Sequence, residues 1–259
     1  MAGGRKGAQA RSDEAVCFDL SDTIIEWEGA YEAALRVTLK EWVGRWSDSE
    51  AAAAAIGDAI RRYRRARRAG KRRADAVRDA AAAMPIDGDE RTMLFIVRQC
   101  RRLQTERAGF VDGAEETMRR LAARYRLAIV TNLPAEDAAA IFSRLRLHRF
   151  VPESRLFAAA TDGGARKPDP RLFRRIAEKL EVPPQRCVMV GDSFRHDVEG
   201  ALRAGWKAVW IRRKAGSAPL RRGPSRSLSF VPSRSPNRIR TASSLTALPR
   251  LLRTLLAAE

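Results

Sequence analysis

Four polar or charged side chains lie directly after, or between, the short apolar runs of this chain: Asp19, Thr131, Lys167 and Asp192. Short apolar runs that end in a polar residue are typical of buried strands followed by a loop. In an open parallel sheet, ligands bind beyond the carboxyl ends of the strands. We therefore expect these four side chains to meet at one site.

The four residue types suit phosphoryl transfer, which needs a nucleophile, a neutralising cation and hydrogen-bond donors around the transferring group. The Asp19 carboxylate can attack phosphorus and form an aspartyl-phosphate. Asp19 and Asp192 together offer the hard oxygen ligands that Mg²⁺ prefers. Thr131 supplies a hydroxyl donor, and Lys167 supplies a positive charge. We expect Asp197, five residues after Asp192, to hold a metal-bound water or to orient Lys167.

Apolar runs that alternate with helical segments predict an α/β fold, a Rossmann-like doubly wound parallel sheet with helices on both faces. We expect its strands at residues 15–18, 127–130, 156–160, 188–190 and 208–211. We expect its helices at 115–124, 134–147, 169–180, 192–205 and 245–255. The alternation places the predicted site at the edge of this sheet.

A long helical segment interrupts the α/β pattern after its first strand. Residues 27–108 contain no convincing strand, and Tyr31, Leu35 and Leu39 recur at helical spacing. The expected organisation is a hydrolase core over 14–28 and 109–259 with an α-helical cap domain inserted over 29–108. Within the core, the Ser/Pro/Arg-rich residues 214–237 lack periodicity and predict a flexible basic excursion.

The formal net charge of +19 is concentrated in two places. Residues 60–79 hold ten basic and two acidic residues, a net +8, and residues 212–259 hold eleven and one, a net +10. The remaining chain is nearly neutral, so its α/β core is not organised as a basic groove. The first basic run has three interpretations: a solvated helix face, a surface that attracts anionic substrates, and a contact with the nucleic-acid backbone.

Composition excludes several classes of protein. No run approaches the roughly 18 apolar residues of a membrane helix, so we expect no membrane partner. The polar N-terminus lacks the apolar core of a signal peptide, and the three cysteines are too scattered for a disulfide framework. We therefore expect a cytoplasmic protein. Its oligomeric state is not predicted from the sequence.

The order of four motifs resembles the haloacid dehalogenase (HAD) superfamily. They are Phe18-Asp19-Leu20-Ser21-Asp22-Thr23, Ile129-Val130-Thr131-Asn132, Arg166-Lys167-Pro168-Asp169-Pro170, and Val190-Gly191-Asp192-Ser193-Phe194-Arg195-His196-Asp197. The helical insertion after the first motif looks like the helical cap of that family. The resemblance covers roughly residues 14–28 and 109–212.

The resemblance implies a role for each matching residue. Asp19 would be the nucleophile and a Mg²⁺ ligand, Asp192 would complete the metal site, and the backbone carbonyl of Ser21 would add a further ligand. Lys167 and Thr131 would act in catalysis by binding the phosphoryl group. Substrate binding would also involve Asn132, and Asp197 would be a supporting acidic residue. Asp192 favours the metal-dependent phosphatases of the family over its metal-free dehalogenases.

One position departs from the family pattern. Phosphatases of this family usually carry an aspartate two residues after the nucleophile, where it protonates the leaving alcohol and later activates water. Here that residue is Ser21, and a hydroxyl is a poor proton carrier. Asp22 follows, but neighbouring side chains at a strand end point to opposite sides, so its carboxylate is not expected to replace the missing one.

These observations predict a HAD-superfamily hydrolase. We expect a Mg²⁺-dependent phosphatase that acts on a small phosphorylated metabolite and is slow because of Ser21. The alternative is a catalytically weak relative that binds an anionic partner or nucleic acid through its basic cap and tail. Contact with nucleic acid is open but not favoured, because no RNA- or DNA-binding motif accompanies the basic runs.

Overall fold

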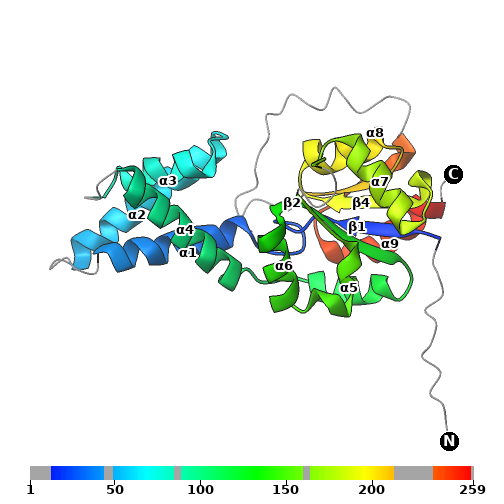
Figure 1. The fold of residues 1–259 in the computed structure, drawn as a ribbon, viewed down its shortest axis with the longest axis horizontal. Coiled ribbons are helices and arrows are strands. Elements are labelled where there is room, and N and C mark those ends of the chain that lie inside the picture. Colours follow the sequence, from blue (N-terminus) through cyan, green and yellow to red (C-terminus); the bar gives the residue numbers. More distant parts are fainter. Residues whose placement is uncertain (1–12, 44–48, 85–88, 160–163, 213–235, 258–259) are drawn as a thin grey trace, which may run out of the picture. The chain divides into compact units, whose positions relative to one another are not determined.

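The structure of the 259-residue chain is a computed structural model. It describes residues 13–43, 49–84, 89–159, 164–212 and 236–257. The described residues fall into two compact units (Figure 1). The sheet unit is built from the described parts of 13–24, 110–212 and 236–257, and the helical unit from those of 25–109. No helix in these described ranges is long and apolar enough to cross a membrane.

The sheet unit is organised around six parallel strands in the order β3-β2-β1-β4-β5-β6. Their bounds are β1 Ala15–Phe18, β2 Arg126–Pro134, β3 Leu156–Ala159, β4 Cys187–Gly191, β5 Lys207–Ile211 and β6 Ile239–Ala242. The strand order reverses between β1 and β4, which makes their carboxyl ends a topological switch point. The predicted Rossmann-like α/β fold is confirmed.

Helices cover both faces of this sheet (Figure 1). They are α5 Ala114–Ala122, α6 Ala135–Arg144, α7 Pro170–Leu180, α8 Gly200–Arg203 and α9 Leu248–Ala257. Ala15 and Cys17 on β1 share one core with Phe173 on α7, whereas the alternating Val16 and Phe18 are fully buried on the opposite face. A sheet buried on both faces explains why its strands are short continuous apolar runs.

Three segments of the sheet unit differ from the sequence prediction. The chain forms β6 where the prediction had no strand, because Ile239–Ala242 is a half-exposed edge strand without a long apolar run. Strand β2 continues through Thr131 to Pro134 instead of ending at Val130. A π-helical turn, Phe194–Glu199, precedes α8 where one regular helix was expected. Most of the predicted excursion, 214–237, lies outside the described residues.

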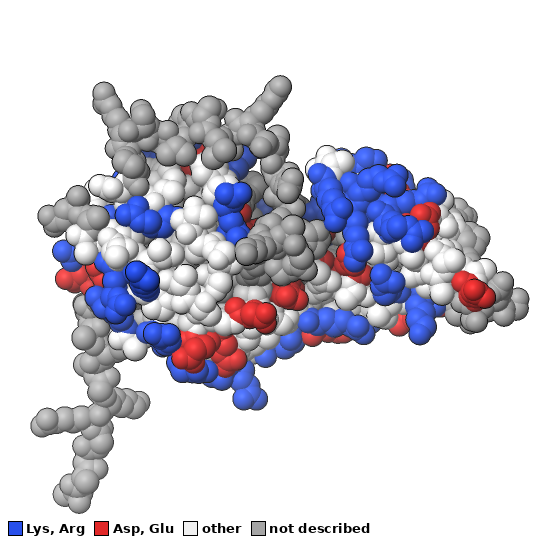
Figure 2. Space-filling model, turned by 180° about the vertical axis from the view of Figure 1, so that it is seen from behind, with Lys and Arg blue, Asp and Glu red and all other residues white. Residues whose placement is uncertain are grey.

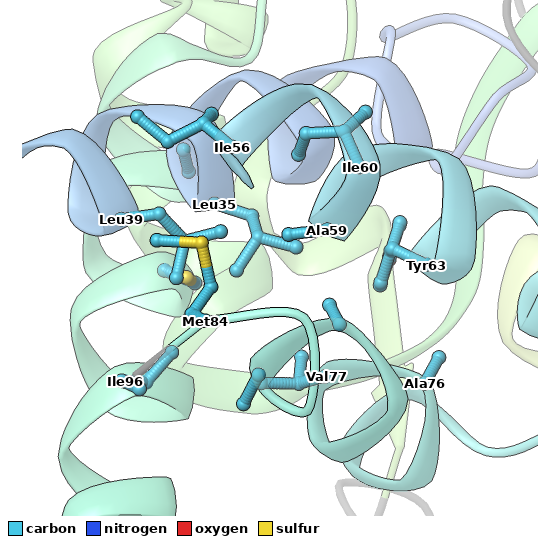
Figure 3. Packing of buried hydrophobic residues seen from close by; sticks show 14 of the residues in the cluster. Leu35, Leu39, Ile56, Ala59, Ile60, Tyr63, Ala76, Val77, Met84 and Ile96 are labelled. Carbon is cyan, nitrogen blue, oxygen red and sulfur yellow. The ribbon is translucent and has the colours of Figure 1, made fainter. Parts of the chain in front are cut away.

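The helical unit contains α1 Glu28–Val43, α2 Ser49–Arg68, α3 Arg73–Ala81 and α4 Glu90–Arg107. Its core is an apolar cluster to which all four helices contribute (Figure 3). Leu35 and Leu39 of α1 point into it, as do Ile60 of α2 and Ile96 of α4, and each is nearly inaccessible to solvent. The helical spacing seen in the sequence therefore marks a real buried face. The predicted cap, 29–108, falls within this unit, and its role as a cap stays a prediction.

Candidate active site

Two predicted site residues lie at the switch point of the sheet. Asp19 directly follows β1, and its backbone N–H donates to the carbonyl of Val190 on β4 at 2.9 Å. Phe18 is aligned with Val190, so Asp192 lies one residue beyond the level of Asp19 on the neighbouring strand. Phe18 is also aligned with Ile129 on β2, which places Thr131 at the level of Asp192 on the other side of β1. The sheet therefore brings these three residues together at the carboxyl ends of its central strands.

Lys167 lies between two carboxylates of this site. Its Nζ donates to Asp19 Oδ1 at 2.6 Å and to Asp197 Oδ1 at 2.7 Å, and both contacts are buried. Burial disfavours the charged amine, but the two carboxylates outweigh burial and raise the pKa of Lys167 above its ordinary value. The Lys167 ammonium is therefore charged at neutral pH. Asp197 thus contacts Lys167, and both tasks expected of it, orienting Lys167 and holding a metal-bound water, stay predictions.

Asn132 holds the backbone of Lys167 in place. Its side-chain nitrogen Nδ2 donates to the Lys167 carbonyl at 2.9 Å, and its Oδ1 accepts from the Lys167 N–H at 3.0 Å. Two opposed hydrogen bonds fix both the position and the direction of the peptide group. The structure thus gives Asn132 a positioning contact that the sequence did not predict, beside the contact with substrate that stays a prediction.

The carboxylates of Asp19, Asp192 and Asp197 form a compact acidic cluster. One oxygen from each lies within 4.8 Å of the others. Burial first, and then repulsion from its acidic neighbours, raises the pKa of Asp192 well above its usual range. Burial also raises the pKa of Asp19, and repulsion from Asp197 adds to this against the attraction of Lys167. One ammonium does not neutralise three carboxylates, so the ionised cluster has an excess of negative charge.

Asp197 reaches this cluster through a close approach to the end of β4. Its Oδ2 accepts from the backbone N–H of Ser193 at 2.9 Å. A Cβ added to Gly191 would overlap the Asp197 carboxylate, so only glycine fits at the end of this strand. The π-helical turn Phe194–Glu199 carries Asp197, and such turns often occur at functional sites.

Two residues outside the predicted set hold Asp192. The backbone N–H of Asp192 donates to Thr23 Oγ1 at 3.1 Å, and Thr23 Oγ1 lies 3.5 Å from Asp192 Oδ1. The indole Nε1 of Trp210 donates to the Asp192 carbonyl at 2.9 Å. Trp210 also meets Phe194 edge-on, with ring centroids 5.0 Å apart. Thr23 stands within the first motif, where its type suggested no role. For Trp210 no sequence pattern signalled the contact, because it joins β5 to the end of β4.

The remaining predicted residues occupy the turn after β1 and the end of β2. Ser21 is half-buried, and Asp22 adopts a left-handed backbone with φ 56°, which is uncommon for residues other than glycine. The expectation that Asp22 does not substitute for the missing aspartate stays a prediction, although its charge contributes to the raised pKa of Asp192. Thr131 is buried, and its Oγ1 accepts from the Leu133 N–H at 3.2 Å.

Comparison with known proteins assigns the chain to a family. The family model for haloacid dehalogenase-like hydrolases matches residues 14–205, which is most of the chain. The chain therefore belongs to the haloacid dehalogenase-like hydrolases, as its four motifs predicted.

Individual relatives extend this similarity to differing lengths. The N-acylneuraminate-9-phosphatase of Rattus norvegicus is 44% identical over 72 residues, which are 26% of this chain and 29% of that protein. The chain thus spans less than a third of that relative. The HAD-hydrolase YfnB of Bacillus subtilis is 26% identical over 198 residues, 75% of this chain and 82% of its own length.

The fold is also found among solved structures. A magnesium-bound crystal structure of Bacillus subtilis YfnB matches with a TM-score of 0.62 at 22% identity, covering 93% of this chain and 98% of that one. A HAD family hydrolase from Deinococcus radiodurans, solved with bound phosphate and sodium, has a TM-score of 0.65 at 22% identity and covers 96% and 99%. At such identities the likeness shows the fold.

Proposed function

We propose that this hydrolase is a Mg²⁺-dependent phosphatase that acts on a small phosphorylated metabolite through an aspartyl-phosphate at Asp19. The observation that carries the proposal is the acidic cluster of Asp19, Asp192 and Asp197 with Lys167 bound between two of its members. The name of the N-acylneuraminate-9-phosphatase, a partial relative, supports the phosphatase class. Because that match is short, it does not carry over the substrate.

The residues present fit a hard divalent cation. Carboxylate oxygens are the ligands that Mg²⁺ prefers, and the three carboxylates of the cluster outnumber the one ammonium that is bound between two of them. Asp19, Asp192 and the carbonyl of Ser21 would hold the ion. When bound, it would neutralise phosphate oxygens and thereby lower the barrier to attack by an anion.

The protein's own residues would carry the two chemical steps. The carboxylate of Asp19 attacks phosphorus, the new O–P bond forms, and the bond between phosphorus and the leaving oxygen breaks. Lys167 and Thr131 hold the phosphoryl oxygens during this transfer. Asn132 keeps Lys167 in position through two hydrogen bonds to its backbone. Water then hydrolyses the aspartyl-phosphate, which releases phosphate and restores Asp19.

Ser21 sets the speed of both steps. Its hydroxyl does not exchange protons readily near neutral pH, and general acid–base catalysis contributes about 10²–10⁴-fold to a rate. A leaving group that needs no protonation loses the least from this. We therefore propose slow turnover of ordinary phosphomonoesters and a preference for activated substrates such as acyl phosphates.

Phosphate release from a panel of phosphomonoesters and acyl phosphates, with Mg²⁺ and with EDTA, tests the proposal. The wild type should release phosphate slowly and only with Mg²⁺, and Asp19→Asn should release none. Ser21→Asp should accelerate release from alkyl phosphates by about 10-fold or more, because it restores a proton carrier. The gain in kcat/KM, which reports the first step, should be much smaller for acyl phosphates, because their leaving group needs no protonation.

Two results would contradict this account. Fast wild-type turnover of alkyl phosphates, with no gain in Ser21→Asp, would show that Ser21 does not limit the reaction. Phosphate release that persists in EDTA or in Asp19→Asn would exclude the proposed nucleophile and cation. A matched substitution at the exposed Asp112, Asp112→Asn, controls for the loss of one carboxylate elsewhere in the sheet unit.

A further inference from the structure

The second half of α2 carries an arc of arginines on its outer side. At 100° per residue, Arg61, Arg64, Arg65 and Arg68 fall within about 100° of one another around the helix axis. All four are exposed, whereas the apolar side of α2 is buried in the core of the helical unit (Figure 3). We call these four residues the arginine arc. Figure 2 shows Lys and Arg side chains gathered on one side of this unit.

The arginine arc is only partly neutralised by its own unit. Arg64 donates to Glu32, and Arg61 reaches Asp58 at 3.3 Å, a carboxylate that Arg62 also uses. Arg65 and Arg68 have no carboxylate within ion-pair distance in the described part of the chain. Arg61 and Arg64 therefore form ion pairs within the unit, whereas the exposed guanidinium groups of Arg65 and Arg68 are available to bind an anion.

Two inward-facing arginines of the same run, the buried Arg67 and the half-buried Arg73, form ion pairs inside the unit. Arg67 and Arg73 both pair with the buried Glu28, at 3.0 and 2.9 Å. The run is thus not uniform, since its inward members close a buried ion cluster and its outward members face solvent. A helix face that needed only solubility would not require four positive charges over two turns without interleaved acidic residues.

We propose that the arginine arc binds the phosphate backbone of a nucleic acid, without reading its bases. Guanidinium groups pair with phosphate in a two-pronged geometry, and arginine keeps its charge at any physiological pH. The arc extends about 10 Å along the helix, at about 1.5 Å per residue. That length suits several successive phosphates better than one small anion, which two guanidinium groups already saturate.

An anionic membrane fits the same surface less well. Helices that lie on membranes combine a basic side with exposed large apolar residues that enter the lipid boundary. The large apolar residues of α2, such as Ile56, Ile60 and Tyr63, are enclosed in the core instead. The arc therefore offers charge without an apolar anchor, which is the pattern of sequence-independent contact with nucleic acid.

Fluorescence anisotropy with a labelled 20-base-pair DNA duplex tests this proposal on the full chain. The expected plot of log affinity against log salt is a line with a slope of about −3 or steeper, since about four contacts each contribute roughly −0.9. The variant Arg65→Ala/Arg68→Ala should lower the slope by about 2 and weaken binding about 10-fold or more at low salt. Both substitutions preserve helix propensity, so the fold should persist.

The matched control is Arg91→Ala/Arg98→Ala on α4. These two arginines are also exposed, belong to the same helical unit and remove the same charge. They should change the affinity by less than about 2-fold and leave most of the slope. The basic tail is intact in both variants, so the difference between them isolates the arginine arc.

Four outcomes would overturn the proposal. The first is a wild type that does not bind the duplex at low salt. The second is an equal loss of affinity in the two double variants, which would indicate net charge alone. The third is binding to vesicles rich in anionic lipid that depends on Arg65 and Arg68 while the duplex is not bound. The fourth is strong competition by inorganic phosphate at constant ionic strength, which would indicate a site for one small anion; we expect this competition to be weak.

Discussion

The two units each bury a cluster of charges, and the clusters have opposite balance. In the sheet unit, three carboxylates share one lysine, and burial with mutual repulsion raises the pKa of Asp192. In the helical unit, the single carboxylate of Glu28 receives Arg67, Arg73 and the hydroxyl of Tyr63, the last at 2.7 Å. These partners outweigh burial and lower the pKa of Glu28 to about 2.

The difference shows how to separate a functional charge cluster from a structural one. A buried ion cluster whose charges are satisfied within the fold stabilises that fold and leaves nothing for a ligand. A buried cluster with surplus charge of one sign costs stability unless a ligand completes it, and such residues concentrate at functional sites. The acidic cluster has two negative charges in excess, which makes it the candidate ligand site. The Glu28 cluster has one positive charge in excess, but Arg73 is partly exposed to solvent and the buried carboxylate is fully paired, so we interpret this cluster as a structural element of the helical unit.

The largest expected effect comes from Asp19→Asn. It removes the proposed nucleophile, so phosphate release should fall by at least about 10³-fold. It also removes one of the repelling carboxylates, so the unfolding midpoint in EDTA should rise. Activity assays and thermal unfolding of the same preparation measure both quantities. A drop in stability together with the loss of activity would mean that the acidic cluster is not in surplus.

Glu28→Gln should do the reverse in the helical unit. It leaves the buried Arg67 and the half-buried Arg73 without their shared carboxylate, and breaking a buried pair in this way costs about 3 kcal/mol of unfolding free energy. Urea unfolding measures the loss. The matched control is Glu32→Gln on the same helix, whose partner Arg64 is 46% exposed, so that the loss should be smaller than that of Glu28→Gln. Equal losses in the two variants would remove the distinction between a buried and a partly exposed pair.

The two clusters should respond to pH with opposite sign. The pKa of Glu28 is about 2 in the folded chain against an ordinary 4.5, so its contribution is complete above pH 4.5 and is lost as the pH falls toward 2. The pKa of Asp19 is raised to about 7, so its charged form destabilises the folded chain and the cost grows as the pH rises through that value.

Urea unfolding across this pH range checks the signs. The destabilisation caused by Glu28→Gln should shrink below pH 4.5, and the gain from Asp19→Asn, measured in EDTA, should shrink as the pH falls below about 7. A gain from Asp19→Asn that grows on acidification would contradict the raised pKa.

The smallest expected effect is that of Trp210→Phe. The ring and its edge contact with Phe194 remain, but the hydrogen bond from the indole to the Asp192 carbonyl is lost. A hydrogen bond of this kind is worth about 1 kcal/mol, so the affinity for Mg²⁺ should weaken about 3- to 10-fold. Isothermal titration with Mg²⁺ measures this, and unchanged affinity would show that Asp192 is held well enough by Thr23.

Much of the fold could be predicted because strongly buried strands leave a simple pattern. The runs at β1 and β4 are apolar throughout, and Asp169 with Pro170 marks the start of α7. Strand β6 escaped prediction because its side chains are only half-buried, so its membership in the sheet depends on backbone pairing with β5. Patterns of hydrophobicity do not register pairing of that kind.

The candidate site could be predicted as a set of residues but not as a geometry. The motifs indicated Asp19, Lys167 and Asp192, because residue types and their order along the chain are visible in the sequence. That Lys167 bridges Asp19 and Asp197 depends on contacts across 148 and 30 residues of chain, which only the folded sheet brings about. The two hydrogen bonds between Asn132 and the Lys167 backbone, and the hydrogen bond from Trp210 to Asp192, likewise form only in the folded chain, and no local sequence pattern predicts them.

The most direct test of the account is a calorimetric titration of the full chain with Mg²⁺. The acidic cluster should bind one ion, and Asp192→Asn should abolish this binding, while Glu28→Gln should retain it in the folded fraction. Absence of Mg²⁺ binding to the wild type, or equal binding by Asp192→Asn, would contradict the claim that the acidic cluster of the sheet unit is the ligand site.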